Sequence, residues 1–138
     1  MTRRMLFMIP LAARCRAADP AREVLDLVAE AAASLSAGNV ALFLKVFDPA
    51  MAGYAKLRDN VKGLTAQGDV QSLIDSLENE GDDRRRAVQL QWTLLMHRGQ
   101  EATSFTRREQ VVKCRVEKQG GKWRIVELEP VEFFAPGS

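Results

Sequence analysis

Few side chains in this sequence could carry acid–base chemistry, and the two best placed are Asp75 and Tyr54. Moving a proton requires a carboxylate base and a hydroxyl group that donates a hydrogen bond to the oxyanion that forms. Asp75 alternates with Leu73 and Leu77, so its side chain could point into a core, and Tyr54 is the only tyrosine. We favour the alternative of a solvated Asp75 on an edge strand, where carboxylates usually remain exposed. The pair is therefore a weak candidate for a catalytic site.

A second set of polar side chains could bind a ligand. Gln89, Gln91 and Thr93 fall on one face of a stretch that alternates over about residues 85–98. Such residues could supply the few polar contacts of a largely apolar pocket. The opposite face carries Trp92 and other large apolar residues and is the natural core, so we favour an outward-facing polar set. If the strand lines a cavity, the candidate ligand-binding residues are Gln89, Gln91, Thr93 and Trp92.

The remaining reactive residues do not fit a metal site or a nucleotide-binding site. His97 is the only histidine, and we expect a structural or exposed role for it because no partner is evident. Cys114 lies between Val112 and Val116 and reads as a buried, inert thiol. No second Cys or His could complete a tetrahedral zinc site with them, and no Walker, GxSxG or GxGxxG motif occurs. We therefore predict no metal and no cofactor.

The charges do not favour a nucleic-acid partner. The run Arg84-Arg85-Arg86 follows Asp82 and Asp83 and lacks interleaved aromatic residues, so we interpret it as a solvated turn. The formal net charge is +2 for the whole sequence. Removing residues 1–18 takes away four of the 20 basic residues and none of the 18 acidic ones, which leaves 16 against 18, or −2. A basic nucleic-acid surface is then poorly supported.

Residues 1–18 have the pattern of a signal peptide. Arg3 and Arg4 precede a short apolar run over residues 5–13, and small residues follow near Ala18. We therefore expect export to the periplasm or the medium, with a cytoplasmic location as the alternative. No stretch approaches the roughly 18 consecutive apolar residues of a membrane helix, so stable membrane insertion is not expected.

The elements that would position these residues are helices followed by strands. Asp19 with Pro20, and later Asn39, are helix-start signals, and Gly38 is a stop signal. The pattern predicts helices over about 20–37, 40–47 and 50–66, the second of them buried almost all round, and strands over about 69–79, 85–98, 103–118 and 123–131. This order predicts an α+β domain with N-terminal helices against an antiparallel sheet. Strands this long are expected to bend at bulges.

In these features the chain resembles the nuclear-transport-factor-2-like superfamily, also called SnoaL-like or cystatin-like cone domains. The resemblance rests on the capped first helix, the run Ala37–Leu44 leading to Phe47-Asp48-Pro49, and the closing stretch Gly121–Val126. It spans residues 19–134 and leaves 135–138 as a loose tail. It implies a strongly curved sheet wrapped around the helices into a cone, an internal pocket, and dimers formed through the sheet. The superfamily includes ketosteroid isomerase, scytalone dehydratase and limonene epoxide hydrolase as well as non-catalytic binding domains.

Three hypotheses follow. The first is an exported, non-enzymatic homodimer that binds a small apolar ligand or a protein partner through the cone cavity or the sheet face. The second is a small-molecule isomerase, dehydratase or hydrolase with Asp75 as base and Tyr54 as hydrogen-bond donor in the same cavity. The third is a cone filled by its own side chains, which functions only by association through the sheet. Fold alone does not choose among them.

Overall fold

The computed structural model describes residues 19–97 and 105–137. The elements in order are α2 (Pro20–Ser36), α3 (Val40–Lys45), α4 (Tyr54–Ala66), β1 (Val70–Gly81), β2 (Arg85–His97), β3 (Phe105–Gln119), β4 (Lys122–Glu129) and the 3-10 helix η2 (Val131–Phe134). The strands form one antiparallel sheet in the order β1-β2-β3-β4. The predicted α+β class and order of elements are confirmed. None of the described helices is long and apolar enough to cross a membrane.

Side-chain caps fix the starts of the first two helices. The Asp19 carboxylate accepts a hydrogen bond from the backbone N–H of Arg22 at 3.2 Å, and the Asn39 side chain accepts one from Leu42 at 3.1 Å. Each cap satisfies one of the N–H groups that the first helical turn leaves free. Both predicted helix starts are therefore confirmed.

Two predictions about the shorter helices are wrong. We expected the second helix to reach Phe47 and to be buried almost all round, but α3 stops at Lys45 and buries only Phe43. It stops because the chain turns to pair with β4: the N–H of Ile125 donates to the carbonyl oxygen of Val46 at 2.8 Å. We expected the third helix to start near residue 50, but it begins at Tyr54, after the left-handed Gly53 (φ +82°).

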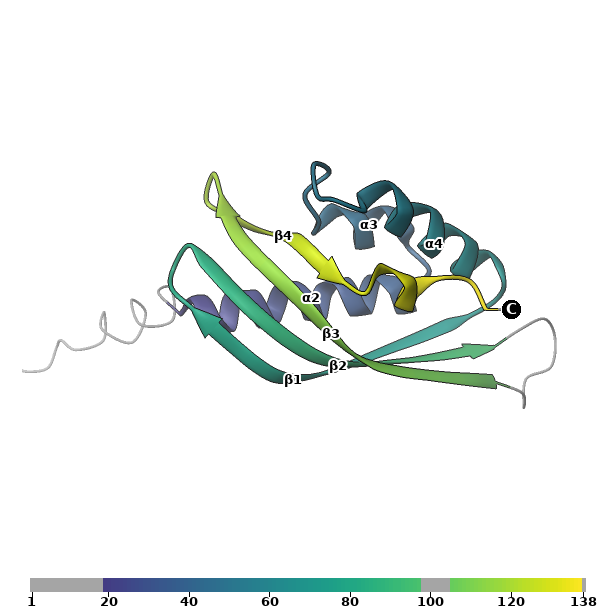
Figure 1. The fold of residues 1–138 in the computed structure, drawn as a ribbon. Helices are drawn as coiled ribbons and strands as arrows, with labels where there is room; N and C mark the ends of the chain where they lie inside the picture. The colour runs from purple at the N-terminus through teal and green to yellow at the C-terminus, as the bar shows by residue number, and fades with distance from the viewer. Residues whose placement is uncertain (1–18, 98–104, 138) are drawn as a thin grey trace, which may run out of the picture.

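The helices all lie on one side of the sheet, which curves around α2 (Figure 1). The strand register places Ser72, Trp92 and Leu94 on the helix side and their alternate neighbours on the other side. Bulges interrupt the register between Ser76 and Glu78 in β1 and between Arg115 and Val116 in the β3–β4 pair. Such bulges increase the local twist of long strands, as the sequence led us to expect.

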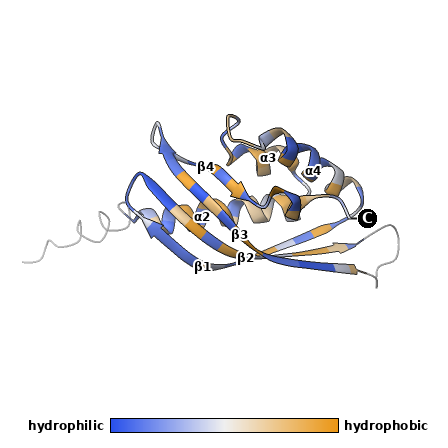
Figure 2. Cartoon of the chain, in the orientation of Figure 1, coloured by the Kyte–Doolittle hydropathy of each residue, from blue (hydrophilic) through white to orange (hydrophobic). Residues whose placement is uncertain are grey.

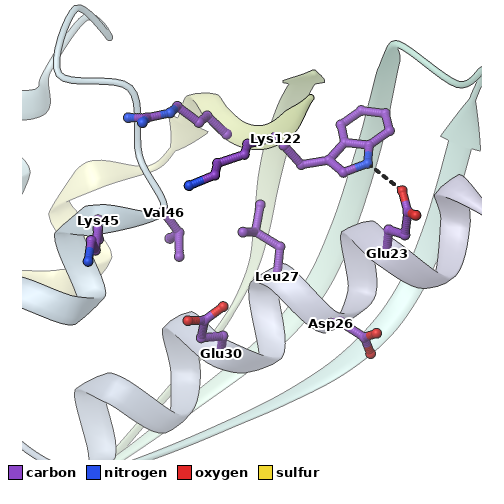
Figure 3. A pocket seen from close by; sticks show the side chains of 9 residues that line it. Glu23, Asp26, Leu27, Glu30, Lys45, Val46 and Lys122 are labelled. Carbon is purple, nitrogen blue, oxygen red and sulfur yellow. Dashed lines mark hydrogen bonds between the residues drawn. The ribbon is translucent and has the colours of Figure 1, made fainter. Parts of the chain in front are cut away.

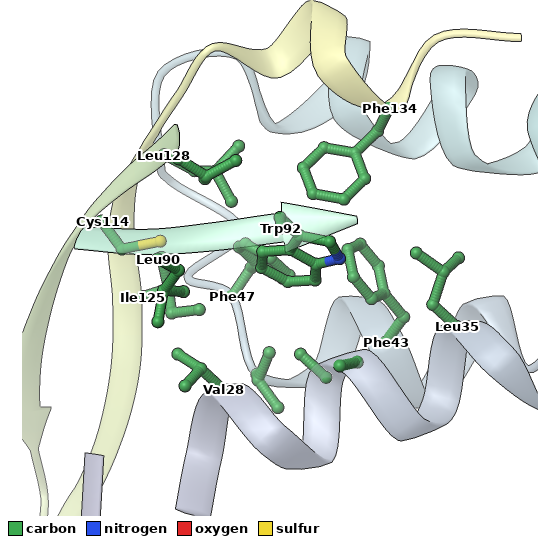
Figure 4. Close-up of a cluster of buried hydrophobic side chains, with 14 of the residues drawn as sticks. Val28, Leu35, Phe43, Phe47, Leu90, Trp92, Cys114, Ile125, Leu128 and Phe134 are labelled. Atoms are coloured by element: carbon green, nitrogen blue, oxygen red, sulfur yellow. The ribbon is translucent and has the colours of Figure 1, made fainter. Parts of the chain in front are cut away.

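Apolar residues gather between the helices and the sheet, as the colouring in Figure 2 shows. Trp92 lies at the centre of this core, with its ring edge-on to that of Phe134 at 5.1 Å between centroids (Figure 4). The indole N–H of Trp92 donates to the Ser72 hydroxyl at 2.7 Å. The Ser72 backbone N–H in turn donates to the Ser36 hydroxyl at 2.7 Å. The buried indole is therefore satisfied, and the same contacts join β1 to α2.

The last residues are held in place, whereas the sequence led us to expect a loose tail from residue 135. The side chain of Gln67, the residue after α4, accepts a hydrogen bond from the N–H of Gly137 and donates one to its carbonyl oxygen, both at 2.9 Å. The Arg108 guanidinium donates to the carbonyl oxygens of Phe133 and Ala135 at 2.5 and 2.8 Å. These contacts hold the segment after η2 against the C-terminal end of α4 and the start of β3. Ser138 lies outside the described residues.

Candidate functional site

The space in which a cone-shaped domain could hold a ligand is filled here. Trp92, Phe43, Phe47 and Phe134 are each less than 2% exposed and pack against one another (Figure 4). Trp92, one of the predicted ligand-binding residues, is therefore a core residue whose polar atom is already bonded to Ser72. A protein interior packed this closely leaves no room for a substrate.

The structure does not place Asp75 and Tyr54 in a shared pocket. Asp75 is exposed, and its register partner Gln91 belongs to the sheet face that points away from the helices. Tyr54 is the first residue of α4, half-buried against the core on the helix side. The two residues therefore lie on opposite sides of the sheet. Proton abstraction by a carboxylate is helped by partial desolvation, and this position of Asp75 does not supply it.

Two of the predicted polar residues meet on the outer face of the sheet, around a residue that we did not predict. Glu109 on β3 is the register partner of Thr93, whose hydroxyl donates to the Glu109 carboxylate at 3.3 Å. Hydrogen bonds from Gln91 and from Arg107 lower the pKa of Glu109 below its ordinary value, and the Arg107 charge and Thr93 add to this effect. The alternation along β2 shows that Gln91 and Thr93 share a face, but only the register of β2 with β3 brings them beside Glu109.

Gln89 lies apart from that cluster. It lines a hollow of about 220 Å³ on the outer face, together with Lys113 and Arg115 of β3 and Glu127 and Glu129 of β4. Arg115 and Glu127 form an ion pair at 3.4 Å across the two strands. The hollow is smaller than the roughly 300–1,000 Å³ of usual small-molecule sites. The predicted polar set is thus divided between two places on the outer face of the sheet.

The same outer face carries unusual apolar exposure. Five large hydrophobic side chains in the described ranges are well exposed, and four of them lie on β1 and β3: Leu73, Leu77, Phe105 and Val111, between 38% and 56% exposed. The fifth is Leu42 on α3. Exposed apolar side chains that share one face of a sheet are available to a partner that packs on that face.

The charges on the outer face are unevenly distributed. The exposed acidic residues of β1, Asp75, Glu78 and Glu80, have no basic residue beside them in that strand. The outward positions of β3 hold Arg107, Lys113 and Arg115. The β1 edge of the outer face is therefore acidic. Most of the positive charge on this face comes from β3, two strands away.

A separate open groove lies on the helix side, between α2, the end of α3 and the start of β4. Its volume is about 440 Å³, and its apolar lining consists of Leu27 and Val46 (Figure 3), together with Trp123. The Trp123 indole N–H donates to the Glu23 carboxylate at 2.9 Å, which joins β4 to α2 across one end of the groove. Sequence analysis gave no sign of this groove, because its lining comes from three separate segments, residues 23–30, 45–46 and 122–124.

The other reactive residues have structural surroundings. His97 is half-buried at the end of β2, with its ring 5.6 Å from that of Phe105. Burial raises the pKa of the Cys114 thiol to about 12, which keeps it protonated and unreactive. Arg86 donates to the side chain and the carbonyl oxygen of Asn79 at 2.8 and 3.0 Å. No cluster of metal-binding side chains occurs within residues 19–97 and 105–137.

Solved structures with the same architecture identify the fold. A nuclear-transport-factor-2-like protein with a cystatin-like fold from Novosphingobium aromaticivorans superposes with a TM-score of 0.66 at 16% identity, covering 91% of this chain and 89% of that one. A nuclear transport factor 2 superfamily protein from Salmonella enterica serovar Typhimurium gives 0.64 at 13% identity, covering 86% and 92%. A protein of unknown function with a cystatin-like fold from Nostoc punctiforme gives 0.60 at 18% identity, covering 78% and 90%.

The chain therefore has the nuclear-transport-factor-2-like, cystatin-like fold, as the sequence resemblance implied. No family model and no curated protein matches the sequence itself. At these identities the similarity establishes the fold and leaves the function to be argued from the surfaces of this chain.

Proposed function

We propose that this domain is a non-enzymatic association module that binds a second copy of itself through the outer face of its sheet. The observation that carries the proposal is the gathering of exposed Leu73, Leu77, Phe105 and Val111 on that face. Within residues 19–97 and 105–137, the helices cover only the other side of the sheet (Figure 1), which leaves this face available to a partner. A small apolar ligand is not part of the proposal, because the cone interior is occupied by aromatic side chains.

The charges favour a second copy as the partner. Two identical faces that pack about a two-fold axis can place β1 of each opposite β3 of the other. In that arrangement Asp75 and Glu78 of one copy face Lys113 and Arg115 of the other, and opposite charges meet at both edges. The four strands, at about 3.3 Å per residue and 4.8 Å apart, span roughly 40 by 20 Å. That is the order of the about 800 Å² that each partner buries in a stable interface.

The proposal is tested by measuring the dissociation constant of the dimer in a chain that starts at Asp19. Sedimentation equilibrium gives this constant for the native sequence and for Leu73→Lys and Val111→Lys. Each substitution places an ammonium group among the apolar side chains of the proposed interface, where its desolvation costs more free energy than a nearby carboxylate returns. The matched control is Leu42→Lys, which changes an equally exposed leucine on α3, outside the sheet.

We expect a dimer for the native chain and for L42K, and at least a tenfold weaker dimer for L73K and V111K, which corresponds to about 1.4 kcal/mol or more. Circular dichroism checks that each variant keeps the native fold. A native chain that stays monomeric at millimolar concentration would reject the proposal. So would a dimer that L73K and V111K leave intact.

Export forms a separate part of the proposal and is supported by sequence alone. Arg3 and Arg4 followed by the apolar run over residues 5–13 would direct the chain out of the cytoplasm. The test is the intact mass of the protein recovered from an exporting host. A mass that starts near Asp19 supports removal of the segment, and a mass that includes Met1 in the exported fraction contradicts it.

A further inference from the structure

The groove between α2, α3 and β4 has walls of opposite charge. Its α2 wall carries Glu23, Asp26 and Glu30, and the facing wall carries Lys45, Lys122 and Arg124. Between them lie Leu27 and Val46, and the volume of about 440 Å³ is within the usual range of small-molecule sites. A ligand in this groove would meet a negative surface, an apolar floor and a positive surface in that order.

Three of the six charged groups interact with residues that the structure places beside them. Glu23 accepts the hydrogen bond from Trp123 and lies 3.9 Å from the Lys118 ammonium, and Asp26 pairs with Arg22 at 3.9 Å. Arg124 acts on Asp48, whose pKa is lowered first by its hydrogen bonds to the Gln119 side chain and the Ala50 backbone, and less by the Arg124 charge. These groups build the walls.

The remaining three are Glu30, Lys45 and Lys122. Among the ion pairs within 4 Å that the described residues form, none includes any of these three, and none includes Arg124, which acts on Asp48 only through its charge. Figure 3 shows them around the side chains of Leu27 and Val46. The Glu30 carboxylate and the ammonium groups of Lys45 and Lys122 thus line one groove and form no ion pair with one another.

We propose that this groove binds a small zwitterion with an apolar body, of the chemical class of an apolar amino acid or a dipeptide of such residues. Its ammonium group lies against the Glu30 carboxylate, and its carboxylate lies between the Lys45 and Lys122 ammonium groups. Its apolar body covers Leu27 and Val46. A simple anion is disfavoured by the acidic α2 wall, and a simple cation by the basic wall opposite. The site is on the helix side, so it does not depend on association through the sheet.

The test compares ligands that carry both charges with ligands that carry one. The probes are L-leucine and L-leucyl-L-leucine. The matched single-charge compounds are 4-methylpentanoate, which lacks the ammonium group, and 3-methylbutylamine, which lacks the carboxylate. Binding is followed by the NMR resonance of the Trp123 indole N–H, which lies at the groove. The Trp92 indole resonance serves as the internal control, because that side chain is in the core.

We expect at least one zwitterion to shift the Trp123 resonance with saturation at millimolar concentration or below, and neither single-charge compound to bind within tenfold of it. Glu30→Gln and Lys122→Gln should each weaken binding at least tenfold. The control Lys62→Gln, an exposed lysine of α4 outside the groove, should not. All three positions are exposed, so each variant is expected to keep the native melting temperature.

Three results would overturn the inference. The first is the absence of any saturable shift with either zwitterion. The second is equal binding of 4-methylpentanoate and leucine, which would make the groove an anion site that ignores Glu30. Binding that survives both E30Q and K122Q would also reject it, because the charges that define the ligand class would then be irrelevant.

Discussion

Replacing Phe134 by alanine tests whether the interior of the cone is a true core. Phe134 is fully buried, and its ring lies 5.1 Å from Trp92, 5.7 Å from Phe43 and 5.1 Å from Phe133. Burial of such a side chain contributes about 1.5–3 kcal/mol, and each aromatic pair adds roughly 0.5–1.5 kcal/mol. With the penalty for the cavity left behind, we expect the free energy of unfolding to fall by about 3–5 kcal/mol.

The assay is urea unfolding followed by far-UV circular dichroism, with Leu42→Ala as the control. Leu42 is 43% exposed and lies outside the proposed sheet interface, so its loss should cost less than about 1 kcal/mol. A dry apolar cavity of this kind can accept a small aromatic molecule. Benzene should therefore raise the melting temperature of F134A and leave that of the native chain unchanged. A loss below about 1 kcal/mol for F134A, or a native chain that benzene stabilises equally, would show that the interior is loosely filled.

Three further outcomes follow from single contacts. Ser72→Ala removes the acceptor of the buried Trp92 indole and should cost about 1–3 kcal/mol of unfolding free energy, against less than about 0.5 kcal/mol for the exposed control Ser76→Ala. Two backbone N–H groups of the β1–β2 turn donate to Asp82 at 2.8 Å and lower its pKa below the ordinary 3.8. The Asp82 carboxyl group therefore binds its proton more tightly in the unfolded chain than in the folded one. The native chain should melt at a higher temperature than Asp82→Ala at neutral pH, and this difference should shrink as the pH falls below about 3.8. In a Cys15→Ser chain, Cys114 should not react with a thiol reagent at neutral pH until guanidinium chloride unfolds the protein, because its pKa is raised to about 12.

The fold could be predicted from the sequence because its signals are local. The caps Asp19 and Asn39 act within three residues, and the alternation of β2 reports directly which face is buried. The errors occurred where distant segments decide the structure. Ile125 draws Val46 and Phe47 out of the helix that their apolar pattern favours. Gln67 and Arg108 bind the last residues, whose own sequence does not predict a fixed conformation.

The candidate sites were harder to predict for the same reason. Thr93 and Glu109 are 16 residues apart, and only the register of β2 with β3 makes them partners. Trp123 and Glu23 are 100 residues apart and meet only because β4 crosses α2. A chain read on its own shows which side chains are polar and which face they share. It does not show which of them approach one another from different elements.

The size of the side chains that point inward decides how this fold can be used. A cone with small inward residues leaves a cavity in which chemistry can occur, because water is excluded and pKa values shift there. In this chain Trp92, Phe43, Phe47 and Phe134 occupy that volume, so the interior contributes stability. The binding that we propose therefore uses the outside of the domain. The two proposed surfaces, the sheet face and the charged groove beside α2, lie on opposite sides of the sheet. One surface can therefore associate with a partner while the other holds a ligand, and variants such as L73K and E30Q can separate the two properties.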